Sequence, residues 1–396
     1  MTRPVVALVG PFPPWRSGIA DQDARLLAAM RRLGVEPLVV GFSRMYPKFL
    51  YPGTMDYSEE KKEEKKDFLE GEGGDAVGSA RGSRLGEASA LLDGLNPFSF
   101  VRAARYLSFK EISLLVLPWW TSYFAPHVSL FLSTLGAERP SAVRLLLCHN
   151  VFDHEPHPLK DALTRAVLRR ADRFAVQNAR SARDISGERP DAPVAVVPHP
   201  AEPRAVLPDR DAARAHLGLP PDAPVFLFSG LLRPYKGWDL LLDAFAALRK
   251  EVPSALLVLA GEPWGKARRL EAWAPAGVRL ELRYLSERER GLWFAAADAV
   301  VCPYRHATGS GIAADALAYG RPVIGTAVEG LSDIVEDGHS GLLVPPGDAP
   351  ALALAMARFV REGLGPRLAA GAARLRASFG PDAHARRLLA LGGVAV

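Results

Sequence analysis

The sequence has few cysteines and no long apolar run. Among its 396 residues there are two cysteines, Cys148 and Cys302, far apart and without the spacing of a metal site. Both stand at the ends of apolar runs, which is typical of buried, reduced thiols in a cytosolic protein. No apolar stretch is long enough to cross a bilayer, and the first residues do not follow the secretory-signal pattern. These absences predict a cytoplasmic protein.

Signatures of nucleic-acid and nicotinamide binding are also missing. The chain has no zinc finger, no RNA-binding signature and no concentrated basic tract, so nucleic acid is not an expected partner. The formal net charge of +5 permits an anionic substrate or an anionic membrane surface without requiring either. The loop after the first apolar run, GPFPPWRSGIA at 10–20, lacks the GxGxxG pattern of dinucleotide-binding domains. A nicotinamide-dependent oxidoreductase is therefore disfavoured.

Strands and helices are expected to alternate through most of the chain. Short apolar runs alternate with segments of helical spacing, which is the pattern of parallel α/β domains. The predicted strands are 5–9, 37–41, 114–117, 144–148, 174–177, 194–197, 225–229, 255–260, 278–283, 299–302 and 322–326. A chain of this length favours two domains. The fold class predicted is α/β, with two Rossmann-like doubly wound domains facing across a cleft, because ligands bind where parallel strands end.

Two composition changes mark the domain organisation. The segment 198–224 is rich in Pro, Asp and Arg and is interpreted as the junction between an N-terminal domain, 1–203, and a C-terminal domain, 204–382. Residues 57–86 carry a run of Glu and Lys followed by many glycines, and cannot bury enough apolar surface to order themselves. They are predicted to form a mobile insertion.

A Gly/Ser loop follows the predicted strand at 299–302. It comprises Thr308, Gly309, Ser310 and Gly311 and leads into a helix that begins at Ile312. Such a loop leaves N–H groups free at the positive end of a helix dipole, which suits a phosphate. The alternative is an ordinary turn between a strand and a helix.

Motifs in the second half occur in the order of a known family. They are FSGLLRPYKGWDLLLDAF at 228–245, LAGEP at 259–263, AADAVVCPY at 296–304, AYGRPVIGT at 318–326 and DGHSGLLVP at 337–345. With this ordered series the chain resembles the retaining GT-B glycosyltransferases of the glycogen-synthase-like group, glycosyltransferase family 4. The resemblance covers nearly the whole chain apart from the charged insertion.

The resemblance implies an enzyme of the hexosyltransferase type. It would take a nucleotide sugar as co-substrate in the C-terminal domain and a glycan, lipid-linked or small-molecule acceptor in the N-terminal domain. Transfer would retain the anomeric configuration, without a metal ion or other cofactor. The resemblance also implies that the C-terminal helix, within 383–396, returns to the first domain.

The family's site residues map onto particular positions of this chain. Arg233 and Lys236 match the cationic pair that grips the donor diphosphate, whose developing charge must be stabilised if no metal is present. The usual Arg directly after the Gly is Leu231 here, and Arg233 stands two places further on. His149 matches a histidine beside the donor sugar, and Gly18 lies in the loop that approaches the ligand.

Two positions depart from the family pattern. The family usually carries two Glu eight apart around the Gly loop, and Ala307 and Asp315 occupy these places. Asp315 can still accept hydrogen bonds from ribose, whereas Ala307 has no polar group to offer the sugar. Three options remain open: a different sugar contact, a slow enzyme, or a catalytically decayed protein that acts as a binding or partner subunit.

Two other groups of residues have alternative interpretations. The predicted helix 159–174 has a basic face that is interpreted either as a peripheral contact with the inner face of the membrane or as a solvated surface; its residues are Lys160, Arg165, Arg169, Arg170 and Arg173. The second group is His149, Asp153, His154, Glu155 and His157. Pro156 and Pro158 exclude the regular helix that a zinc-binding HExxH pair requires, so no metal site is predicted there.

Overall fold

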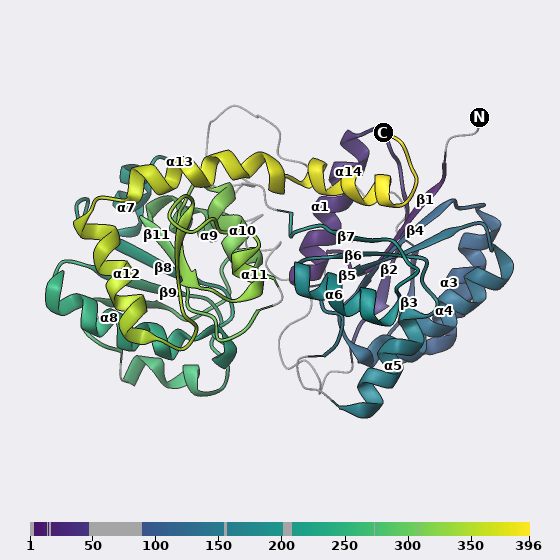
Figure 1. The fold of residues 1–396 in the computed structure, drawn as a ribbon, viewed down its shortest axis with the longest axis horizontal. Coiled ribbons are helices and arrows are strands. Elements are labelled where there is room, and N and C mark those ends of the chain that lie inside the picture. Colours follow the sequence, from purple (N-terminus) through teal and green to yellow (C-terminus); the bar gives the residue numbers. More distant parts are fainter. Residues whose placement is uncertain are drawn as a thin grey trace, which may run out of the picture. The chain divides into compact units, whose positions relative to one another are not determined.

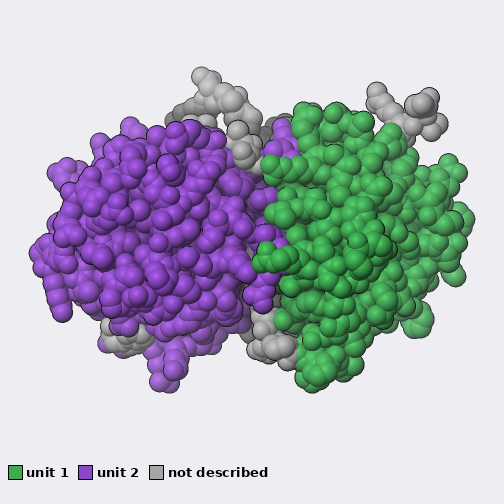
Figure 2. All heavy atoms as spheres, in the orientation of Figure 1, with its two compact units in different colours: residues 1–176, 181–197, 384–396 green, residues 177–180, 198–383 purple. Residues whose placement is uncertain are grey.

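The chain divides into two compact units. The computed structural model describes residues 4–13, 15, 17–46, 89–153, 157–200, 208–272, 274–307 and 309–396. Unit 1 comprises residues 1–176, 181–197 and 384–396, and unit 2 comprises residues 177–180 and 198–383 (Figure 2). The predicted insertion, 57–86, and the predicted domain boundary between 203 and 204 lie outside the described residues.

Unit 1 is built on a parallel sheet of seven strands (Figure 1). The strand order is β3-β2-β1-β4-β5-β6-β7, with bounds Val6–Val9 (β1), Leu38–Arg44 (β2), Ser89–Asp93 (β3), Leu114–Trp119 (β4), Val143–Cys148 (β5), Arg173–Val176 (β6) and Val194–Val196 (β7). All residues of β1 and β4 are buried, as expected for parallel strands covered on both faces.

Helices cover both faces of this sheet. They are α1 (Gly18–Arg32), α3 (Pro97–Phe109), the short 3₁₀ helix η1 (Ser122–Phe124), α4 (Ala125–Glu138), α5 (Pro158–Leu168), α6 (Ala179–Glu188) and α14 (Pro381–Leu391). Alternate residues of β1 enter opposite cores: Ala7 and Val9 pack with α3 and α4, whereas Val6 and Leu8 pack with α1 and α14. This alternation is the two-residue period of a strand.

The C-terminal segment belongs to unit 1. Leu388 and Leu389 of α14 are fully buried in the same core cluster as Val6 and Leu8 of β1. The Arg173 guanidinium, at the start of β6, donates a hydrogen bond to the carbonyl of Leu391. Residues 384–396 are therefore an integral layer of unit 1 although they follow unit 2 in the sequence.

The predicted helix 159–174 was wrong at its C-terminal end. Helix α5 ends at Leu168, and Arg173 already belongs to strand β6. The helical period fails there because residues 173–176 pair in register with β5, and residues 174–176 are buried in the sheet. The basic residues that follow Leu168 therefore lie in a turn and a strand, and the single basic face expected from a longer helix does not form.

Unit 2 is built on a second parallel sheet, of six strands. The order is β10-β9-β8-β11-β12-β13, with bounds Val225–Ser229 (β8), Leu256–Ala260 (β9), Val278–Glu281 (β10), Ala299–Cys302 (β11), Val323–Thr326 (β12) and Gly341–Val344 (β13). Its helices are α7 (Arg210–Leu217), η2 (Pro234–Lys236), α8 (Trp238–Glu251), η3 (Gly265–Ala272), α9 (Glu287–Ala296), α10 (Gly311–Ala318), α11 (Glu329–Ser332), α12 (Ala349–Arg361), α13 (Gly365–Leu375) and η4 (Arg376–Phe379).

The strand order of unit 2 places a switch point between β8 and β11. From β8 the chain moves outward to β9 and β10, and then returns to the other side of β8 with β11, β12 and β13. The loops that follow β8 and β11 therefore diverge from neighbouring strand ends, which is where open parallel sheets bind ligands. Within the described residues, no helix combines the length and the apolar character needed to cross a membrane.

Candidate functional site

Loops at the C-terminal edge of the unit 2 sheet pack closely through glycines. Gly230 follows β8 with a φ of 97°, and Gly261 follows β9 with a φ of 148°. A Cβ at Gly261 would stand 2.1 Å from the carbonyl oxygen of Gly230, so a larger residue cannot occupy this position without moving the backbone. Glycine at this contact brings the β8 and β9 loops together.

Arg233 is held over an indole ring. Its Cζ lies 4.5 Å from the ring centroid of Trp264, in the loop after β9, at a distance that gives a cation–π interaction. The Leu232 N–H donates to the carbonyl of Glu262 at 3.0 Å, which fixes the two loops to each other. Among the described residues, no carboxylate pairs with Arg233, and its Nε has no hydrogen-bond partner.

Lys236 lies beside Arg233 in a desolvated position. Its Nζ is 5.9 Å from the centroid of the Tyr304 ring, and a Cβ at Gly230 would stand 3.0 Å from it. Desolvation lowers the pKa of Lys236 to about 8, and the nearby Arg233 charge acts in the same direction. Within the described ranges no acidic side chain forms an ion pair with this amine. Two cations thus lie together where a bound anion would stabilise both.

A second loop, after β11, is fastened to the first. The guanidinium of Arg305 donates to both carboxylate oxygens of Asp239, at 2.8 and 2.9 Å, and to the carbonyl of Pro234 at 2.8 Å. A Cβ at Gly237, whose φ is 67°, would lie 2.0 Å from the carbonyl oxygen of Pro303. The β8 and β11 loops therefore contact each other through backbone as well as charge.

The Gly/Ser loop leads into helix α10 as predicted from the sequence. Ser310 caps the helix, with its Oγ accepting from the N–H of Ala313 at 3.1 Å, and the Tyr304 hydroxyl lies 3.2 Å from the same oxygen. A Cβ at Gly309 would stand 2.5 Å from Oε1 of Gln177, so this loop passes close to residues 177–180 of unit 2. Gly311 is the first residue of α10, and Thr308 lies outside the described residues.

Asp315 and Ala307 sit on either side of the start of α10. Asp315 is buried, with 6% of its surface exposed, and its Oδ2 lies 4.0 Å from Nη2 of Arg290. Ala307 is half-buried, and its carbonyl accepts from the N–H of Gly330 at 3.0 Å. A ribose contact by Asp315 stays a prediction, in which this carboxylate would serve both the sugar and Arg290.

Two predicted site residues belong to unit 1. His149 directly follows β5; it is buried, and its backbone N–H donates to the carbonyl of Trp119 at 2.8 Å. Gly18 is the first residue of α1, after the capping residue Ser17. A Cβ at Gly18 would meet no described atom within 4 Å. Their roles toward a ligand remain predictions.

The structure therefore brings part of the predicted set together. Arg233, Lys236 and the loop 309–311 lie in unit 2 at the same edge of its sheet, whereas His149 and Gly18 lie in unit 1. In the described part of the chain, no cluster of three or more His, Cys, Asp or Glu is placed to hold a metal ion. Of the His, Asp and Glu residues between 149 and 157, His154 and Glu155 lie outside the described residues.

Sequence reasoning missed three residues that shape this site. Trp264 supports Arg233, Arg305 fastens the two loops, and Tyr304 bonds the helix cap while its ring lies below Lys236. Their position in the chain could have indicated them, because each residue follows the end of β9 or β11 by only a few residues. These two strands flank β8 in the sheet. Using that signal requires the strand order, which the sequence pattern does not give.

Comparison with known proteins identifies relatives of this chain. Residues 223–362 match the family described as glycosyl transferases group 1. A D-inositol 3-phosphate glycosyltransferase of Nocardioides sp. is 38% identical over 200 residues, which are 46% of this chain and 44% of that protein. The protein of the same name from Streptosporangium roseum is 33% identical over 254 residues, 60% of this chain and 58% of that protein. The chain spans about half the length of the curated relatives it matches.

Solved structures share the whole fold at low sequence identity. Sucrose-phosphate synthase from Thermosynechococcus elongatus has a TM-score of 0.70 and 20% identity, with 98% of each chain covered. The Anabaena protein HepE, solved in complex with UDP, has a TM-score of 0.69 and 15% identity, also with 98% of each chain covered. Residues 223–362 are thus similar in sequence to glycosyl transferases group 1, and the whole chain has the two-unit α/β fold (GT-B) of these solved structures.

Proposed function

We propose that this protein is a glycosyltransferase that uses a nucleotide-diphosphate sugar as donor. The observation that carries the proposal is the pair of cations, Arg233 and Lys236, which lie together at a strand edge without a carboxylate partner among the described residues. A diphosphate supplies the missing negative charge, and it is also the leaving group of the reaction.

Helix α10 adds a second source of positive potential for the same ligand. Its N-terminus follows the β11 loop, which Arg305 fastens to the β8 loop that carries Arg233 and Lys236. The N–H groups of a first helical turn and the helix dipole favour a phosphate group. In the proposed complex the diphosphate accepts hydrogen bonds from both cations, and Asp315 accepts from the ribose.

The remaining parts of the proposal concern the acceptor and the stereochemistry. Unit 1 would bind the acceptor, a glycan, a lipid-linked sugar or a small molecule, with His149 beside the reacting sugar. Transfer would proceed with retention and without a metal ion, the two cations taking the developing charge of the leaving group. The family resemblance of the motifs at 228–245 and 296–326 supports these features.

A binding experiment tests the donor site directly. Purified protein would be titrated calorimetrically with UDP, GDP and ADP in the absence of metal ions. UDP would be tested first, because HepE, which has the same fold, was solved with UDP and with UDP-glucose. We expect one nucleotide diphosphate to bind the wild type, and Arg233→Ala or Lys236→Ala to weaken binding about tenfold or more, the usual cost of a charge-assisted hydrogen bond.

Matched controls separate this site from general charge. Arg268→Ala and Lys250→Ala remove exposed cations elsewhere in unit 2 and should leave nucleotide binding at the wild-type value. If these variants weaken binding as much as Arg233→Ala, or if folded wild-type protein binds none of the three nucleotides, the donor-site proposal is wrong. With the bound nucleotide known, its sugars would be assayed for transfer to inositol phosphates and simple glycosides, and the product anomer read by NMR.

A further inference from the structure

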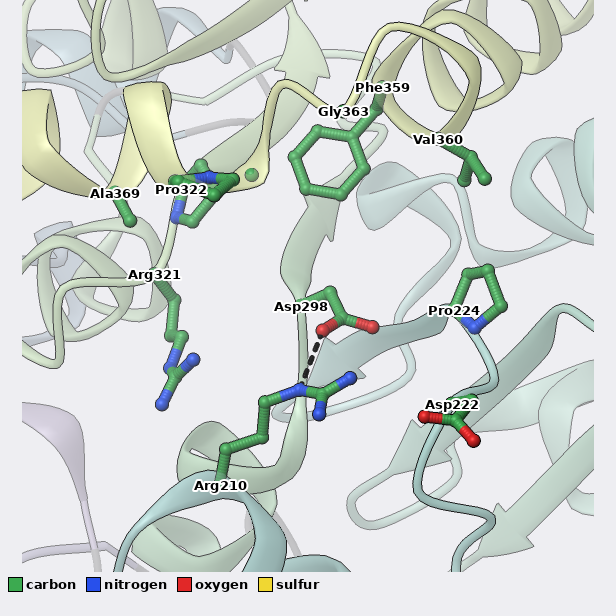
Figure 3. A pocket seen from close by; sticks show the side chains of 12 residues that line it. Arg210, Asp222, Pro224, Asp298, Arg321, Pro322, Phe359, Val360, Gly363 and Ala369 are labelled. Atoms are coloured by element: carbon green, nitrogen blue, oxygen red, sulfur yellow. Dashed lines mark hydrogen bonds and ion pairs between the residues drawn. The ribbon is translucent and has the colours of Figure 1, made fainter.

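A pocket of about 400 Å³ lies at the other edge of the unit 2 sheet (Figure 3). Pro224, Asp298 and Pro322 line it, and each directly precedes a strand: β8, β11 and β12 respectively. Because the strands are parallel, residues before them lie at the edge opposite to the loops that carry Arg233 and Lys236. This pocket is therefore separate from the proposed donor site.

Arg321 lines the pocket with a charge that no carboxylate among the described residues pairs. Its Nε is buried without a hydrogen-bond partner, and the side chain forms no ion pair with any residue that the structure describes. Desolvation lowers the pKa of Arg321, and the neighbouring Arg210 and Arg214 lower it further, against the attraction of Asp298. A cation in this environment is stabilised by any anion that can enter.

Asp298, the nearest carboxylate, is already saturated with donors. It accepts from Nη2 of Arg214 at 2.7 Å, from Nε of Arg210 at 3.0 Å and from the N–H of Val225 at 2.8 Å. Asp298 thus already serves Arg210 and Arg214, and Arg210 also pairs with Asp211 at 3.0 Å, so neither acid is bonded to Arg321. The other lining acid, Asp222, is exposed and lies across the pocket from Arg321 (Figure 3).

The rest of the wall suits an anion that carries a small organic group. Helix α13 begins at the pocket with Gly365 and Pro366, and its N-cap residue, Leu364, offers no side-chain cap. Because Pro366 has no N–H, the backbone N–H of Gly365 is the donor that this first turn can offer a ligand in the pocket. Phe359, Pro224 and Pro322 supply apolar surface between these polar groups.

We propose that this pocket binds a phosphate group, with Arg321 as its main ligand and Arg210 and the start of α13 as further donors. The phosphate is either inorganic phosphate or the monoester of a small metabolite; both present the same trigonal set of oxygens to the guanidinium. Binding here is distinct from binding of the nucleotide diphosphate and does not depend on the proposed function.

The test uses a variant in which the donor site is disabled. In the Arg233→Ala/Lys236→Ala protein, calorimetric titration with inorganic phosphate and with glucose 6-phosphate should each show one site. Adding Arg321→Gln should weaken that binding about tenfold or more, because a charge-assisted hydrogen bond is lost. Asp222→Asn should strengthen it, since a negative charge is removed from the pocket.

Controls distinguish the possible outcomes. Arg367→Ala, which removes an exposed arginine of α13 that does not line the pocket, should bind both probes as its parent does. A thermal unfolding midpoint of the Arg321→Gln variant close to that of its parent would show that the variant is folded, whatever the outcome at the proposed donor site. Tighter binding of glucose 6-phosphate than of phosphate would identify the ester as the ligand, and equal affinity would identify the free ion. Binding that is unaffected by Arg321→Gln, or absent in a folded parent, would overturn the proposal.

Discussion

At the scale of single residues, the proposed donor site depends on how Lys236 is solvated. Its amine faces the Tyr304 ring and lies near the Cys302 thiol and the Arg233 guanidinium, and desolvation brings its pKa down to about 8. The same burial raises the pKa of Cys302 to about 12, so this thiol stays neutral and cannot pair with the lysine. In the free protein Lys236 is therefore mostly protonated at pH ~7 and loses its charge as the pH rises past about 8, whereas a bound diphosphate would keep it charged to higher pH.

We predict that nucleotide diphosphate binding weakens as pH rises through about 8. Below its folded-state pKa of about 8 Lys236 is an ammonium that attracts the diphosphate, and above it the charge is lost. Affinity at pH ~9 should be about tenfold lower than at pH ~7, because only about a tenth of the free amines remain protonated one unit above the pKa. Calorimetry in buffers of different ionisation enthalpy would detect the accompanying proton uptake.

Lys236→Arg is the matched control for this pH dependence. An arginine keeps its charge across the range, so affinity in that variant should be nearly constant between pH ~7 and ~9. A wild type whose affinity does not change over this range, or a variant that keeps the wild-type pH profile, would contradict the assignment of the titrating group to Lys236.

At the scale of elements, the site is a contact between two loops. The β8 loop, 230–237, and the start of the β11 loop, 303–305, are joined by the close approach of Gly237 to Pro303, and Arg305 pairs with Asp239 at the start of α8 directly after the β8 loop. The charged partners are each more than 40% exposed, so their ion pair adds little stability. The contact between the Gly237 and Pro303 backbones constrains the separation of the two loops more strongly, because backbone atoms cannot rotate out of the way as a side chain can.

We predict that Gly237→Ala destabilises unit 2 and weakens nucleotide binding. The new Cβ would lie 2.0 Å from the Pro303 carbonyl oxygen, so the two loops must separate. Gly265→Ala is the matched control: Gly265 has a similar φ, 60° against 67°, but open space around it. Both variants carry the left-handed strain of about 1–2 kcal/mol, and only Gly237→Ala adds overpacking of about 1–3 kcal/mol.

Chemical denaturation and calorimetry would measure the two effects. The expected result is a larger loss of unfolding free energy in Gly237→Ala than in Gly265→Ala, with reduced nucleotide affinity in the first variant alone. Equal losses in the two glycine variants would mean that the loops tolerate separation, and that the contact does not position the site.

At the scale of the whole molecule, the chain returns to unit 1 after completing unit 2. Residues 384–396 contribute buried side chains to the core that contains β1 and α1, including the fully buried Leu388. The stability of the first unit therefore depends on residues at the far end of the sequence. In Figure 1 this segment is drawn as helix α14, ending near the point marked C.

We predict that Leu388→Ala destabilises unit 1 by about 2–5 kcal/mol, the usual cost of emptying a buried leucine site. Leu159→Ala is the control in the same unit: Leu159 is 62% exposed, and the change should alter stability by less than about 0.5 kcal/mol. Differential scanning calorimetry, with hydrogen exchange to assign each transition, would measure the change. A Leu388→Ala protein as stable as the control would mean that α14 is not part of the unit 1 core.

Local patterns in the sequence determined most of the strands and the choice of candidate residues in the second half. Apolar runs with turn residues at their ends gave β8 and β11 with the bounds that the structure has, because a buried parallel strand needs continuous apolar side chains. The ordered motifs also singled out Arg233 and Lys236. Both conclusions depend on residues that are close together in the chain.

Only the tertiary structure decided which distant residues meet. Strands β3 and β13 were not foreseen, and α5 ended earlier than its helical period predicted, because sheet pairing overrides local propensity. Trp264 reaches Arg233, and Arg210, Asp298 and Arg321 gather at one pocket, because the strand order sets which loops share an edge. That order results from packing whole strands and helices against each other, a property of the folded chain that no single segment encodes.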